Sequence, residues 1–131
     1  VDRSFGEPVG RMPVRVTEAG RADPLFEGLP EQFEAFGGHK EALSVTPPHA
    51  VVLATSAACP VQAFRVGTNV YATQFHPELD AASLQTRIDA YRNYGYFPPE
   101  EAEELKAVAR ERDVEWPATI LRRFVRGYAA R

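Results

Sequence analysis

The sequence predicts an α/β fold, because two regions of the chain have different hydrophobic periods. Between Pro13 and Phe75, short segments alternate apolar and polar residues, which is typical of half-buried strands. From Asp80 onward, apolar residues recur every three or four positions, which is typical of amphipathic helices. The chain therefore combines a strand-rich part with a helical part.

Five short segments of the first region have the pattern of strands. The last two are separated by Gly67-Thr68-Asn69, a turn-forming sequence, so we expect them to pair as a hairpin. The expected strands are residues 14–16, 32–36, 51–54, 61–66 and 70–75.

The first expected helix follows the last strand. Asp80 can cap it, and Leu84, Ile88 and Tyr91 would then share one face. Gly95 is expected to end this helix, because glycine readily adopts the backbone conformation that terminates helices.

Two more helices are expected near the end of the sequence. One follows Pro98-Pro99 and runs to about Arg112, with glutamates in its first turns, where they complement the helix dipole. The other starts near Trp116-Pro117 and has a broad apolar stripe. The stripe consists of Ile120, Leu121, Phe124, Val125 and Tyr128.

Composition narrows the classes of partner. The 15 basic and 18 acidic residues give a net charge of −3, which argues against nucleic-acid binding as the main role. No apolar run approaches the length of a membrane span, and no secretory signal is recognised. One cysteine excludes a disulfide within the chain and fits a reducing compartment, so the expected location is the cytoplasm.

His76 and Glu78 follow the last expected strand and form the most informative pair of side chains. Catalytic groups of α/β folds usually lie at the carboxyl ends of strands. An imidazole can take a proton from a thiol or a hydroxyl and return it to a leaving amine. Glu78 is near enough to bind the other ring nitrogen, and Pro77 restricts the backbone between them. The pair can therefore act as a general base with its orienting carboxylate.

The string Gln74-Phe75-His76-Pro77-Glu78 resembles the C-terminal half of class I glutamine amidotransferase domains, especially the type found in GMP synthases. Three upstream segments agree with the same family in the same order. They are residues 23–30, 38–41 and 52–56, and the resemblance covers roughly residues 12–95.

The resemblance implies a fold and a reaction. The family domain is a three-layer, flavodoxin-like α/β structure, to which this chain would contribute the C-terminal part, an antiparallel strand set, with added C-terminal helices. Residues 1–97 are then expected to belong to the amidotransferase-like domain, and residues 98–131 to form a helical extension. The implied reaction is hydrolysis of the glutamine side-chain amide through a cysteine thioester, with no metal or organic cofactor.

The resemblance also implies roles for individual residues. His76 would be the general base and acid, and Glu78 would orient it. Gly38, His39 and Lys40 resemble part of the glutamine pocket, where the family offers backbone groups to the substrate. The family more often has serine or asparagine at the position of Gly38.

The nucleophile of this family is a cysteine in a Gly-x-Cys-x-Gly turn, and the sequence has no such motif. Its single cysteine, Cys59, enters a strand and precedes Pro60, whereas a nucleophile needs a helix N-terminus to lower its pKa. We therefore expect Cys59 to be a structural, buried residue. We also expect this sequence to be the C-terminal part of a longer polypeptide and to be inactive alone.

The expected partners follow from the resemblance. They are glutamine, the remainder of the amidotransferase domain, and a synthase domain or subunit that accepts the ammonia. Two alternatives stay open: a γ-glutamyl hydrolase-like thiol hydrolase, and a noncatalytic binding or regulatory module on the same scaffold.

The remaining histidines are expected to lie in loops. Taken on residue pattern alone, His39 follows a strand at a glycine-permitted bend, and His49 lies in a surface turn. Three histidines and one cysteine without close ligand spacing predict no structural zinc site.

Overall fold

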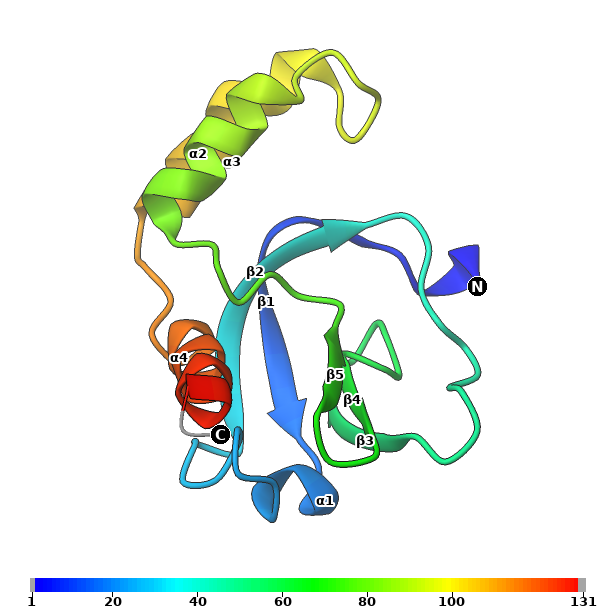
Figure 1. The fold of residues 1–131 in the computed structure, drawn as a ribbon. Coiled ribbons are helices and arrows are strands. Elements are labelled where there is room, and N and C mark those ends of the chain that lie inside the picture. Colours follow the sequence, from blue (N-terminus) through cyan, green and yellow to red (C-terminus); the bar gives the residue numbers. More distant parts are fainter. Residues whose placement is uncertain (1, 130–131) are drawn as a thin grey trace.

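The computed structural model describes residues 2–129, in which a curled five-stranded sheet precedes the last three helices (Figure 1). The strands are β1 (Glu7–Val16), β2 (Gln32–His39), β3 (Val51–Thr55), β4 (Ala63–Val66) and β5 (Val70–Thr73). The helices are α1 (Glu18–Arg21), α2 (Ala81–Ala90), α3 (Ala102–Arg110) and α4 (Trp116–Ala129), with 3-10 turns at Arg3–Phe5 and Pro99–Glu101.

All neighbouring strands of the sheet pair antiparallel, in the order β2-β1-β3-β4-β5. In β1, Met12, Val14 and Val16 are buried and alternate with more exposed neighbours, as expected for a strand with one face on a core. The predicted hairpin of β4 and β5 is confirmed and turns at Gly67, whose φ is 66°. Each of the five expected strands is present.

Two strands are much longer than the sequence predicts, whereas β4 starts two residues later and β5 ends two residues earlier than predicted. β1 begins at Glu7, and β2 continues to His39, so the prediction that His39 lies in a loop after the strand is wrong. Gly37 and Gly38 allow close strand pairing here, because a Cβ on Gly38 would lie 2.8 Å from the Cα of Val9. The two glycines therefore serve the approach of β1 to β2 instead of a bend.

The last three helices start near the positions that the sequence predicts, and two of them end earlier than predicted. The Asp80 carboxylate accepts a 2.8 Å hydrogen bond from the amide of Ser83, whose hydroxyl accepts one from the Asp80 amide at 2.9 Å. α2 ends at Ala90 instead of Gly95, because Tyr91 leaves helical geometry and a turn follows. α3 likewise ends before the predicted position, and α4 begins at the predicted one.

Two apolar cores hold these elements together. The larger core lies between the sheet and α4, and it includes Phe75 and Ile120. The smaller core lies between α2 and α3, and Phe36 from β2 belongs to it. Figure 1 shows α2 and α3 side by side beyond the end of the sheet, and α4 against β2. β2 therefore contributes to both cores.

The predicted apolar stripe of α4 is buried only in part. Ile120 is buried and Phe124 packs against the larger core. Leu121, Val125 and Tyr128 are 38%, 57% and 48% exposed. α4 packs against β2, and the ring of Phe124 also contacts the ring of Tyr71 in β5, with 6.0 Å between the centroids.

A buried carboxylate fixes the loop after α1 to the β4–β5 hairpin. The Asp23 side chain is 0% exposed and lies 2.5 Å from Arg65 Nη1. It also accepts hydrogen bonds from the Tyr71 hydroxyl, at 3.1 and 3.2 Å, and from the amide of Leu25, at 2.9 Å. Burial is the main cause that raises the pKa of Tyr71, and the negative charge of Asp23 is the second cause. The buried negative charge of Asp23 is therefore stabilised by the ion pair with Arg65 and by these hydrogen bonds.

Replacing Asp23 should reveal this dependence. Asp23→Asn keeps the shape but removes the charge that Arg65 faces, so the free energy of unfolding should fall by about 2–3 kcal/mol. Urea denaturation measures the change. The matched control is Glu27→Gln, because Glu27 is exposed and its change should stay within about 0.5 kcal/mol. Equal effects of the two substitutions would contradict the role of Asp23.

Candidate active site

The main chain carries His76 from β5 across to β2. The amide of Gln74 still donates to Gln62, at 2.7 Å, but the amide of His76 donates to the carbonyl oxygen of Phe36, at 2.9 Å. Figure 1 shows this connection between β5 and α2 passing across β2. His76 therefore lies next to the strand that contains Gly37 and Gly38.

The side chains of His76 and Glu78 form a direct hydrogen-bonded pair. Nδ1 of His76 lies 2.8 Å from Oε1 of Glu78, and the two side chains are 38% and 45% exposed. A turn closed by the Leu79 amide and the His76 carbonyl oxygen, 3.2 Å apart, brings them together. The structure thus forms the contact that a base and an orienting carboxylate require.

A positively charged side chain, Arg87 of α2, also lies beside this pair. Its Nη1 lies 3.5 Å from Nδ1 of His76, and its Nη2 lies 3.9 Å from Oε1 of Glu78. The carboxylate can only accept hydrogen bonds and is much the nearer neighbour, so we assign the hydrogen of the neutral ring to Nδ1. Nε2 of His76 is then the ring atom available to accept a proton from a substrate or a thiol.

A cavity of about 210 Å³ opens beside the pair. His76 and Gly38 both line it, so the structure brings together one predicted catalytic residue and one predicted substrate-binding residue. Its other walls come from β1, β2, α2 and the turn before α3. These lining residues are Val9, Gly37, Leu79, Leu84, Arg87, Ile88, Tyr91, Tyr96 and Phe97.

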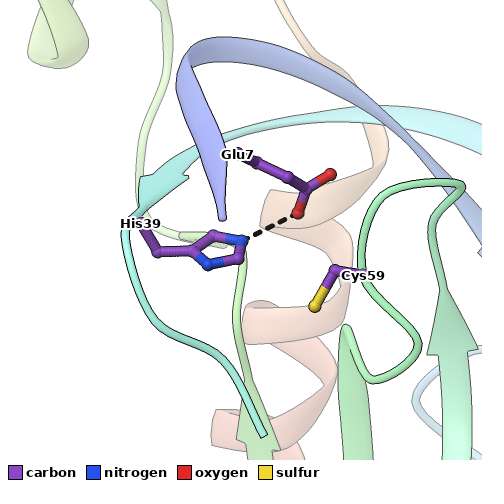
Figure 2. A group of neighbouring side chains, drawn as sticks. All are labelled: Glu7, His39 and Cys59. Atoms are coloured by element: carbon purple, nitrogen blue, oxygen red, sulfur yellow. Dashed lines mark hydrogen bonds and ion pairs between the residues drawn. The ribbon is translucent and has the colours of Figure 1, made fainter. Parts of the chain in front are cut away.

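The side chain of His39 does not line this cavity. Figure 2 shows it pointing toward Glu7, and its Nε2 lies 2.8 Å from Oε1 of that residue. Its Nδ1 lies 3.0 Å from the carbonyl oxygen of Glu41. This side chain is only 7% exposed, and His39 is not among the residues that line the cavity.

Lys40 lies near the rim of the cavity. Its Nζ donates a hydrogen bond to the carbonyl oxygen of Gly95 and lies 5.8 Å from the ring centroid of Tyr96, a lining residue. The three predicted substrate-binding residues thus occupy three settings: Gly38 in the wall, Lys40 at the rim, and the His39 ring elsewhere.

Cys59 has the properties of a buried, unreactive thiol. It is 0% exposed, and its Sγ donates a 3.4 Å hydrogen bond to the carbonyl oxygen of Val61. Burial is the main cause that raises the pKa of this thiol, and the Glu7 carboxylate adds to it. Cys59 lies between β3 and β4, with no helix following it, so it lacks the setting of a nucleophile.

Sequence reasoning missed Arg87 and the tyrosines of the cavity. A signal for Arg87 exists, because it lies three residues after Leu84 and four before Tyr91 on the predicted helix. The face assigned to apolar packing is therefore also the face that reaches His76. For Tyr96 no such signal exists, because it lies in the turn that follows α2.

Comparison with known proteins places the chain in a family. Residues 2–90 match the protein family described as "Glutamine amidotransferase class-I". The match spans more than half of the chain, and the protein therefore belongs to the class I glutamine amidotransferase family.

Relatives in this family include GMP synthases. A GMP synthase [glutamine-hydrolyzing] subunit from Pyrococcus abyssi is 30% identical over 103 residues, which are 72% of this chain and 52% of that protein. The protein of the same name from Thermococcus kodakarensis is 35% identical over 71 residues, or 53% of this chain and 37% of that protein. The chain thus spans about half or less of these relatives.

Solved structures agree on the fold. A glutamine amidotransferase from Thermotoga maritima superposes with a TM-score of 0.64 at 23% identity, over 95% of this chain and 53% of that one. A glutamine amidotransferase from Methylobacillus flagellatus gives 0.65 at 19% identity, over 95% and 54%. The fold is therefore that of part of a class I glutamine amidotransferase domain, and the fold class that the sequence predicts is confirmed.

No helix among the described residues has the properties of a membrane-spanning segment. None of the helices in residues 2–129 is both long and apolar enough to cross a bilayer.

The ring tautomer of His76 tests the geometry of the pair without any assay of activity. Above neutral pH, nitrogen NMR should find the hydrogen of His76 on Nδ1, because Glu78 accepts it. Glu78→Ala should shift the ring toward the other tautomer. His49, which is exposed, serves as the internal control. Finding the hydrogen of His76 on Nε2 in the unaltered protein would refute the assignment.

Proposed function

We propose that this chain is the base-carrying part of a glutaminase, which hydrolyses the side-chain amide of glutamine and passes ammonia to an acceptor. The observation that carries this proposal is the 2.8 Å contact between His76 and Glu78 beside a cavity that Gly38 also lines. The family to which the chain belongs supplies the reaction class.

The proposed mechanism assigns one proton path to His76. Its Nε2 removes the proton of a cysteine thiol, and the sulfur attacks the amide carbon of glutamine. The same proton then goes to the departing nitrogen, so that ammonia leaves and a thioester remains. His76 next takes a proton from water, whose oxygen attacks the thioester carbon. The same proton then passes to the departing sulfur, so that glutamate and the thiol are released. Glu78 stabilises the imidazolium in both halves.

The nucleophilic cysteine is proposed to come from outside these residues. Cys59 is buried, its thiol pKa is raised, and it does not line the cavity of His76. In this proposal the remainder of the amidotransferase domain supplies the cysteine, and the chain alone has no glutaminase activity. A cytoplasmic location is part of the same proposal.

Substrate contacts are proposed for the end of β2. Gly38 would offer its backbone in the cavity wall, and His39 would contribute only backbone groups. Lys40 lies at the rim, where its ammonium could meet a carboxylate of glutamine.

The acceptor is proposed to be held by a partner synthase domain or subunit. This suggestion comes from the relatives, which are named as glutamine-hydrolyzing subunits of GMP synthase. We further propose that residues 1–97 form the amidotransferase part and residues 98–131 an extension. Because Ala109 and Ile120 of the extension are buried in the two cores, deleting residues 98–131 should abolish cooperative thermal unfolding.

Substitution of His76 in the complete enzyme tests the proposal. His76→Ala should lower kcat for ammonia release from glutamine by about 10²–10⁴-fold, the range for loss of a general acid–base group. Glu78→Ala should lower it less. The matched control is His49→Asn, because His49 is exposed and asparagine tolerates its φ of 66°. Unchanged turnover in His76→Ala would remove His76 from the mechanism.

The same assay separates the alternatives. A noncatalytic module would release no ammonia even when complete, and the absence of a suitable nucleophile among residues 2–129 is the observation in its favour. A γ-glutamyl hydrolase-like enzyme would cleave γ-glutamyl peptides in preference to free glutamine.

A further inference from the structure

Three metal-ligating side chains meet in the interior of the protein, away from the cavity of His76. Glu7 comes from the start of β1, His39 from the end of β2, and Cys59 from the loop between β3 and β4. A carboxylate oxygen, a ring nitrogen and the sulfur all lie within 4.8 Å of one another, and Figure 2 shows the three side chains converging. The Glu7 and His39 side chains are 6% and 7% exposed, and Cys59 is fully buried.

The charge balance of this group favours a cation. The Glu7 carboxylate accepts hydrogen bonds from Gln62 and from the Ser56 hydroxyl, 2.9 Å away, and contacts His39 at 2.8 Å. Gln62 and Ser56 are neutral, so only a proton shared with His39 or a bound cation can offset the buried negative charge. A divalent cation with one carboxylate, one thiolate and one neutral imidazole gives a site of zero net charge.

Gln62 borders the same group of side chains. It is fully buried, and its Oε1 has no hydrogen-bond partner among the described residues. Its amide nitrogen contacts Oε1 of Glu7 and lies 3.1 Å from Oγ of Ser56. The amide nitrogen of Gln62, and not its oxygen, therefore faces Glu7 and Ser56.

We propose that Glu7, His39 and Cys59 bind a divalent transition-metal ion of the zinc class. Nitrogen, sulfur and carboxylate donors are those that zinc prefers, and its tetrahedral ligand atoms lie about 3.5 Å apart, within the separations of this group. Binding releases the proton of the Cys59 thiol, and any proton on Nε2 of His39, to the solvent. A water occupies the fourth position.

The proposed site differs from the prediction in the sequence analysis, where the spacing of the histidines and the cysteine indicated no structural zinc site. That prediction did not include Glu7, which is 32 residues from His39 in the sequence. The metal would join the ends of β1 and β2 to the β3–β4 loop. His39 follows Gly38 directly, so the metal would also fix the backbone at the wall of the cavity.

Titration of the metal-free chain with Co²⁺ and Zn²⁺ tests the proposal. We expect one ion per chain and a near-ultraviolet sulfur-to-cobalt band, which can arise only from Cys59 because the chain has one cysteine. Cys59→Ala should abolish the band and weaken metal binding by about 100-fold or more. His39→Gln should weaken metal binding by a similar factor. Mg²⁺ should not compete, because it prefers oxygen ligands.

The control variant is again His49→Asn, which should bind like the unaltered protein. Circular dichroism shows whether each variant is folded. The cobalt spectrum of the unaltered chain decides the question even if a variant unfolds. The absence of a sulfur-to-cobalt band, or equally weak binding in all variants, would overturn the proposal and leave a buried Glu7–His39 pair without metal.

Discussion

The hydrogen bond from the His76 amide to the Phe36 carbonyl oxygen is the contact on which the candidate active site depends. It draws the chain away from the β4–β5 hairpin and sets it beside β2, whose glycines form one wall of the cavity. The side chain of Phe36 is buried in the core of α2 and α3. One residue of β2 thus contacts the main chain of His76 and packs against the helices α2 and α3.

His39 and His76 show how burial separates the roles of similar pairs. Each has one ring nitrogen 2.8 Å from a glutamate oxygen. The His39 pair is almost completely buried, with both ring nitrogens engaged, so its chemistry is limited to holding strands or an ion. The His76 pair is more than one-third exposed and borders a cavity. Exposure, and not the pairing itself, makes His76 suitable for proton transfer.

Local patterns predicted much of this structure, and long-range contacts account for what they missed. Alternation, together with a short apolar run at residues 51–54, located the strands, and Asp80 marked the start of α2, because these signals depend on neighbouring residues. The continuation of β2 to His39 depends on pairing with β1, which no local pattern records. The contact of Glu7 with His39 depends on the same pairing. For the site, the His76–Glu78 contact was predictable because a tight turn separates the two residues, whereas Arg87 required knowledge of how α2 packs.

The burial of Cys59 has a practical consequence for chemical labelling. Alkylating reagents attack thiolates, and a fully buried thiol with a raised pKa presents neither the charge nor the access that they need. In a polypeptide that combines this chain with a nucleophilic cysteine, the two sulfur atoms would differ greatly in reactivity. A thiol-directed reagent would then mark the nucleophile alone, and Cys59 would be modified only after unfolding.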